Sequence, residues 1–137
     1  PAVVTVIVGD EPGVVAAART LAEKMQDEPP RFRPRTAVPD DTPLLVIGLE
    51  ADVVPWLQSR GLPAKPAALK SGSAAAWTAT SAYGKTLAVV TARDAQTLAA
   101  LARPLPHYGR RSYVIFDGGK AVDAGVWPAR AQSVSVK

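Results

Sequence analysis

Hydrophobic side chains fall in three continuous runs that predict buried strands. Each run is rich in Val, Ile and Leu and is bounded by polar, Gly or Pro positions. A run without polar alternation is typical of a strand that is covered on both faces of a sheet. The three predicted strands are residues 3–8, 43–49 and 86–91.

Apolar positions spaced three and four residues apart predict a helix after each of these strands. The predicted helices cover residues 10–27, 50–61 (starting at Glu50 or Asp52) and 94–103. Asp10 and Asp94 are predicted to be N-caps that accept hydrogen bonds from free N–H groups of the first turn. We expect Pro55 to interrupt the second helix and Pro104 to end the third, because proline lacks a backbone donor and clashes with the preceding turn.

The second half of the chain predicts two antiparallel hairpins. Loosely alternating residues precede the turn Tyr83-Gly84-Lys85, and a second turn contains Gly118 and Gly119. Short turns of this kind between apolar runs are typical of hairpins. The two hairpins comprise residues 74–91 and residues 112–127.

These elements together predict an α/β (α+β) fold, with a single mixed β-sheet, about three helices packed on it and two antiparallel hairpins in the second half. Residues 31–35 join this sheet as an extended connection or an edge strand. We expect one compact domain over residues 1–128 and a polar C-terminal tail over residues 129–137. Because the chain starts without Met and inside an apparent strand, we interpret it as a domain excised from a larger protein.

The composition is that of a globular domain. Of the 137 residues, 47% are hydrophobic and 20% are charged, and no apolar run approaches the roughly 20 residues that cross a bilayer. The absence of cysteine excludes disulfides and thiolate metal sites. Ten Arg against six Lys, with abundant Ala, Val and Pro, is typical of a GC-rich bacterial genome.

The net charge of +4 is distributed unevenly. Residues 1–69 hold seven basic and nine acidic residues, a net −2, whereas residues 70–137 hold nine basic and three acidic residues, a net +6. A basic half can attract an acidic surface. The basic residues are scattered singly apart from Arg110 and Arg111, and no ladder of aromatic and basic residues is present, so we expect no nucleic-acid partner.

The residue types that common catalytic sites need are scarce. His107 is the only histidine, which leaves too few ligands for catalytic zinc and weakens any Ser-His-Asp triad. Residues 9–13 lie where a phosphate could bind, but Asp10 and Glu11 would repel an anion, and the loop has neither a Gly-x-Gly-x-x-Gly nor a Walker pattern. We therefore predict no catalytic residue, no cofactor and no metal in this domain.

The remaining candidate function is binding of a ligand or partner. Residues 105–111 concentrate histidine, tyrosine and arginine in one connection, and binding groups often collect in loops on a rigid scaffold. An ordinary helix-to-strand crossover would explain the same segment. The three tryptophans could be ligand platforms or core residues, and Trp127, beside a proline, is expected to be the most exposed. The candidate contact residues are His107, Tyr108, Arg110, Arg111 and Trp127.

Two parts of the chain resemble known families. Residues 86–94, followed by Leu98 and Leu101, resemble the strand–cap–helix unit of non-catalytic α/β domains in bacterial carbohydrate-active enzymes, such as the N-terminal domains of α-glucuronidases and β-hexosaminidases. The motifs LPHYG (105–109), SYVIF (112–116) and GVWP (125–128) resemble the C-terminal end of some bacterial proteins related to the aminopeptidase-N-like zinc metallopeptidases (gluzincins). There, a small α/β module follows the peptidase region.

The gluzincin resemblance implies a parent protein and carries no activity to this chain. It spans about a quarter of the sequence, and the zinc ligands and catalytic glutamate of the peptidases have no counterpart here, although zinc is possible in the parent. We expect a non-catalytic accessory domain of a larger bacterial, exported hydrolase, periplasmic or secreted, that packs on its catalytic part or shapes access to it. The alternatives are a small-ligand or carbohydrate-binding module and an interaction module that binds an acidic surface.

Overall fold

A single mixed sheet organises the computed structural model, which describes residues 2–127. Within that range the sheet has seven strands in the order β2-β1-β3-β5-β4-β6-β7. The strands are β1 (Val4–Val8), β2 (Arg31–Phe32), β3 (Leu44–Leu49), β4 (Ala74–Thr80), β5 (Thr86–Ala92), β6 (Tyr113–Asp117) and β7 (Lys120–Gly125). Strands β2, β1, β3 and β5 are parallel neighbours, whereas β4, β6 and β7 each run antiparallel to the strand before them in this order.

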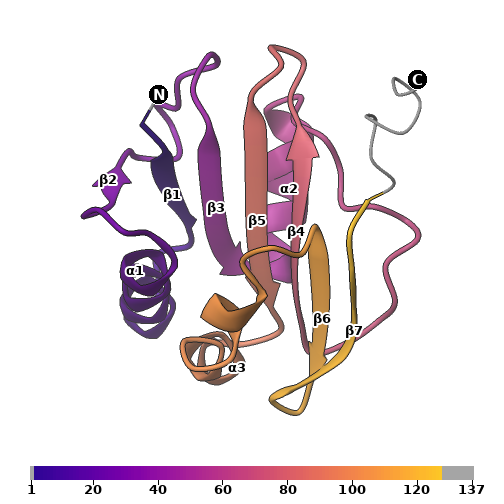
Figure 1. Cartoon of the computed structure of the whole chain (residues 1–137). Helices are drawn as coiled ribbons and strands as arrows, with labels where there is room; N and C mark the ends of the chain where they lie inside the picture. The colour runs from indigo at the N-terminus through magenta and orange to yellow at the C-terminus, as the bar shows by residue number, and fades with distance from the viewer. Residues whose placement is uncertain (1, 128–137) are drawn as a thin grey trace, which may run out of the picture.

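The helices cover the two faces of this sheet unequally. They are α1 (Pro12–Met25), α2 (Glu50–Ser59), α3 (Ala95–Ala100) and a short 3-10 helix, η1 (Leu105–Tyr108). In Figure 1, α1 and α3 lie in front of the sheet and α2 lies behind it. The predicted mixed sheet, with its three helices and antiparallel hairpins, is confirmed. No helix within residues 2–127 is long and apolar enough to cross a membrane.

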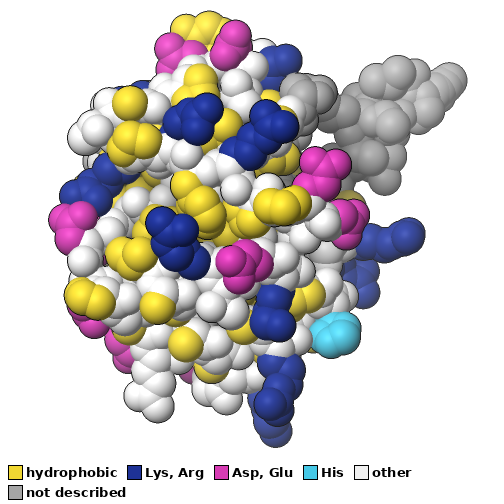
Figure 2. Space-filling view, turned by 90° about the vertical axis from the view of Figure 1, so that its left-hand side faces the viewer, with side chains coloured by type: hydrophobic (Ala, Val, Ile, Leu, Met, Phe, Trp, Pro, Cys, Tyr) yellow, Lys and Arg dark blue, Asp and Glu magenta, His cyan; other side chains and the backbone are white. Residues whose placement is uncertain are grey.

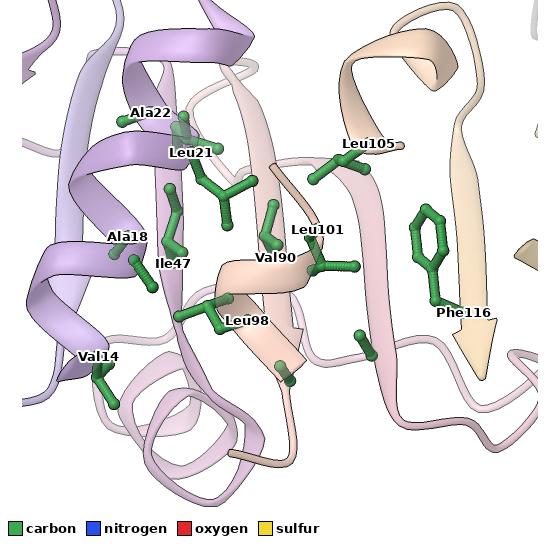
Figure 3. Packing of buried hydrophobic residues seen from close by; sticks show 14 of the residues in the cluster. Val14, Ala18, Leu21, Ala22, Ile47, Val90, Leu98, Leu101, Leu105 and Phe116 are labelled. Atoms are coloured by element: carbon green, nitrogen blue, oxygen red, sulfur yellow. The ribbon is translucent and has the colours of Figure 1, made fainter. Parts of the chain in front are cut away.

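Two hydrophobic clusters, one on each face, hold these layers together. The front cluster joins α1 and α3 to the sheet, and Figure 3 shows Leu21 and Leu98 lying over Ile47 and Val90. The back cluster packs Val53 and other residues of α2 against β1, β3 and β5. Each buried aliphatic side chain contributes roughly 1.5–3 kcal/mol of transfer free energy, so the two clusters are the main source of stability.

The alternation of side chains along β4 separates the two clusters. Ala75 and Trp77 are buried on the α2 face, while Ala74 and Ala76 lie on the α1 face. Residues 61–72 cross the α2 face, where Leu62 packs against the back cluster. The indole N–H of Trp77 has no hydrogen-bond partner within the described protein, so its contribution to stability comes from packing.

Three predictions about the helices are wrong, and one is confirmed. Asp10 does not cap α1: the N-cap is Glu11, without a side-chain hydrogen bond. Pro55 does not interrupt α2, because the carbonyl of Ala51 that loses its N–H partner belongs to an exposed residue and can bind water. Helix α3 ends at Ala100, before Pro104, where the chain tightens into 3-10 turns. Asp94 caps α3 as predicted, accepting a hydrogen bond from the Thr97 amide at 2.8 Å.

Candidate functional site

The carboxyl ends of the parallel strands, where open α/β sheets usually bind ligands, carry an ion pair in this protein. Arg35 donates two hydrogen bonds of 3.0 Å to the carboxylate of Asp10, directly after β1. The hydrogen bond and the charge of Arg35 lower the pKa of Asp10, and the same contacts raise the pKa of Arg35. Arg35 is therefore already engaged by a carboxylate, which disfavours a phosphate ligand at this position.

The described part of the chain contains no cluster of side chains suited to bind a metal ion. No group of three or more His, Cys, Asp or Glu side chains within residues 2–127 is placed to hold a metal ion. The acidic side chains near the strand ends, such as Glu50, take part in structural contacts: Lys65 donates to Glu50 at 3.2 Å. This contact fastens the loop after α2 to the start of α2.

Two of the three tryptophans are parts of the scaffold. Trp77 is 1% exposed and lies in the back cluster, with the Lys65 ammonium 5.8 Å from its ring centroid. Trp56 donates its indole N–H to the carbonyl of Arg35 at 3.2 Å and so ties the connection between β2 and β3 to α2. Trp77 therefore presents no open face to a ligand, and Trp56 is half-buried with the Arg60 guanidinium 5.9 Å from its ring centroid.

Trp127 is half-buried and fastens the end of the last hairpin. Its ring stacks on Tyr113 with centroids 4.8 Å apart, and its indole N–H donates to the carbonyl of Thr78 at 2.8 Å. Its backbone N–H donates to the hydroxyl of Ser112. Gly125 permits this stack, because a Cβ on that residue would lie 2.5 Å from the hydroxyl oxygen of Tyr113. Trp127 packs with the α2-face cluster.

The predicted recognition segment, in contrast, lies on the α1 face. Leu105 is buried and anchors η1 to the front cluster. Tyr108 is half-buried, and its ring meets that of Phe116 edge-on, with centroids 5.7 Å apart. His107, Arg110 and Arg111 are exposed. Tyr108 therefore has a fixed orientation, while the charged groups around it are open to solvent.

A hollow connects part of this segment to the sheet. It encloses about 180 Å³ over β4, β5 and β6, and its lining includes Met25, Ala76, Ala88, Tyr108 and Arg111. Met25 is the last residue of α1 and Tyr108 the last residue of η1, so two helix ends bound the space. We call it the α1–η1 hollow. It exists because α3 has only six residues and leaves this part of the sheet uncovered.

The structure brings together two of the five candidate contact residues. Tyr108 and Arg111 line the α1–η1 hollow, His107 and Arg110 belong to the same segment without lining it, and Trp127 lies on the opposite face. Sequence reasoning missed Met25, Ala76 and Ala88. Their small or flexible side chains gave no local signal, because the alanines of β4 occur on both faces of the sheet.

The segment of residues 95–116 carries charged side chains of one sign only. Residues 95–116 contain Arg103, Arg110, Arg111 and His107 and no carboxylate. All four are exposed, and none takes part in the ion pairs formed within residues 2–127. On the side of β2 and α1, by contrast, Figure 2 shows basic, acidic and hydrophobic side chains intermixed. The α1–η1 hollow is thus an apolar recess beside a segment of one charge sign.

Comparison with known protein families and with curated proteins finds no match to this chain.

Proposed function

We propose that this chain is a non-catalytic accessory domain of a larger, exported bacterial hydrolase related to the aminopeptidase-N-like zinc metallopeptidases. We propose further that it docks on the catalytic part of that protein through the α1–η1 hollow. The observation that carries the proposal is the hollow itself, a recess with an apolar floor that has a fixed tyrosine and an exposed arginine at its rim.

The composition of this surface supports docking. Tyrosine and arginine are enriched among the residues that dominate protein–protein binding, and apolar pockets receive their anchors. Tyr108 is held by Phe116, so little side-chain freedom is lost when a partner binds. Two of the three motifs that resemble the gluzincin C-terminal module, residues 105–109 and 112–116, lie in the segment that borders the hollow, and the described part of the third, residues 125–127, does not line it.

The carbohydrate-binding alternative has less support from the contacts. A platform built from Trp127 and residues 107–111 would need both on one surface, yet they lie on opposite faces of the sheet. The indole N–H of Trp127 and one face of its ring are already engaged by Thr78 and Tyr113. Binding of a glycan by either part alone stays a prediction.

The test is association in trans. The remainder of the parent protein and this chain would be purified separately and their affinity measured by sedimentation or calorimetry. We expect Ala88→Leu, which fills the hollow, and Arg111→Glu each to weaken association by at least about tenfold, equivalent to about 1.4 kcal/mol. Arg60→Glu, on the α2 side, is the matched control and should have no effect.

Two results would overturn the proposal. One is turnover of aminoacyl or peptide substrates by this chain alone at a rate comparable to that of the parent. The other is association in trans that neither Ala88→Leu nor Arg111→Glu changes, which would place the contact elsewhere.

A further inference from the structure

We infer that the segment received by the α1–η1 hollow is an acidic peptide that inserts one apolar side chain between Met25 and Tyr108. This inference rests on the proposed function and names the chemistry of the partner. It follows from two independent properties of the surface, the size and lining of the recess and the positive charge of residues 95–116 on one side of it.

The recess fits one side chain. An apolar cavity of roughly 150 Å³ accepts a molecule the size of benzene, and the α1–η1 hollow encloses about 180 Å³. Its floor includes the small residues Ala76 and Ala88, and the buried Val90 lies beside Ala76 on the neighbouring strand. A leucine or phenylalanine side chain therefore fills it, whereas a second bulky side chain has no room beside the first.

The arginines beside the hollow favour acidic residues on both sides of the apolar side chain in the bound peptide. Arg111 lines the hollow, and Arg110 precedes it in the chain. Arginine binds carboxylates with paired, charge-assisted hydrogen bonds, so acidic residues flanking the anchor gain contacts at the rim. Residues 95–116 carry no Asp or Glu, so the approach of an acidic segment meets no repulsion from α3, η1 or the start of β6. On the other side of the hollow, Glu23 and Asp27 lie two residues from Met25, so the flanking acidic residues are expected to lie toward Arg111.

The experiment uses three synthetic, fluorescently labelled peptides with the complete chain. Acetyl-DELED-amide carries the acidic residues and an anchor, acetyl-DESED-amide lacks the anchor, and acetyl-KRLRK-amide reverses the charge. We expect the first to bind at least about tenfold more tightly than either of the others, and its binding to weaken steeply as NaCl is raised to about 0.5 M.

Variants separate the two properties. Ala88→Leu should abolish the advantage of DELED over DESED while leaving the salt dependence in place. A double variant, Arg110→Gln with Arg111→Gln, should remove the salt dependence and the preference over KRLRK. Shifts of amide resonances in NMR spectra should map to residues 108–112 and to Ala76 and Ala88, and Arg31→Gln on the β2 edge is the control that changes nothing.

Equal binding of the three peptides, or resonance shifts confined to the β2 edge, would overturn the inference. The outcome is distinguishable from failure of the proposed function. If the peptides fail but Ala88→Leu still weakens association in trans, the hollow docks the parent through a segment of different chemistry. If both fail, the hollow is not a docking site.

Discussion

The two faces of the sheet around β4 differ in how completely they are covered. On the α2 face, Ala75 and Trp77 are 3% and 1% exposed beneath α2 and the loop that follows it. On the α1 face, the neighbouring Ala76 is only half-buried, and Ala88 beside it lines an open hollow. The same two strands thus supply a sealed core on one side and the floor of an open hollow on the other.

The difference lies in side-chain size and in the length of the covering elements. A tryptophan fills the α2 face, and a loop of twelve residues (61–72) passes over it. The α1 face has Ala76 and Ala88 on the same two strands, and the six-residue helix α3 does not reach over them. On these two strands, therefore, Trp77 fills the sealed face, whereas Ala76 and Ala88 leave the hollow open on the other.

The largest effect is expected from Trp77→Ala. Removing a fully buried indole loses its packing and leaves a cavity, which costs about 3–5 kcal/mol of unfolding free energy. The loss should be measured by urea denaturation followed by circular dichroism. Trp127→Ala is the comparison, because this half-buried ring should cost clearly less. Equal losses for the two variants would contradict the assignment of Trp77 to the sealed core.

A matched pair of substitutions tests the asymmetry directly. Ala75→Leu forces three extra carbon atoms into the sealed face and should cost about 1–3 kcal/mol. Ala76→Leu, one residue further along β4, points into the α1–η1 hollow and should change stability by less than about 1 kcal/mol. If Ala76→Leu proved as destabilising as Ala75→Leu, the hollow would be closed in solution and unable to receive a side chain.

The elements and their order could be predicted from sequence, and the positions of the candidate residues in space could not. Continuous apolar runs specify strands such as β1 and β3, and glycine-containing turns specify the hairpins, because these signals are local. Whether Trp127 and Tyr108 share a surface depends on which face each side chain reaches. That is decided by strand register and by the path of η1, which are tertiary properties.

The helix ends show the same limit. Asp10 satisfies the local rule for an N-cap, yet its carboxylate pairs with Arg35, twenty-five residues away in sequence. A charged partner with two donors outcompetes a single backbone amide at an exposed position. Within residues 2–127, the nearest charged partner of Asp94 is its neighbour Arg93, at 3.6 Å, which is too long for a hydrogen bond. The carboxylate of Asp94 therefore caps α3, as the sequence indicates.

A smaller effect is expected at the cap of α3, the short helix that leaves the hollow open. The hydrogen bonds from Thr97 lower the pKa of Asp94, so the stabilisation is present above its ordinary pKa of about 3.9 and is lost as pH falls through the lowered value. Asp94→Ala should therefore accelerate exchange of the Thr97 amide at neutral pH, while Asp94→Asn, which keeps an acceptor, should accelerate it less. No difference between Ala and Asn would show that the cap is not formed.

The smallest effect is expected from the ion pair that links the two faces. Asp10 precedes α1 on the front face, and Arg35 lies in the connection that Trp56 ties to α2 behind the sheet. Because the pair is exposed, water and salt screen it, and Arg35→Met should leave the unfolding midpoint almost unchanged. Its signature is the titration of Asp10. By NMR, the pKa of Asp10 should lie below about 3.9 in the unmodified protein and return toward that value in Arg35→Met. An Asp10 pKa that does not respond to the substitution would mean that the two faces are joined only by the sheet and its hydrophobic clusters.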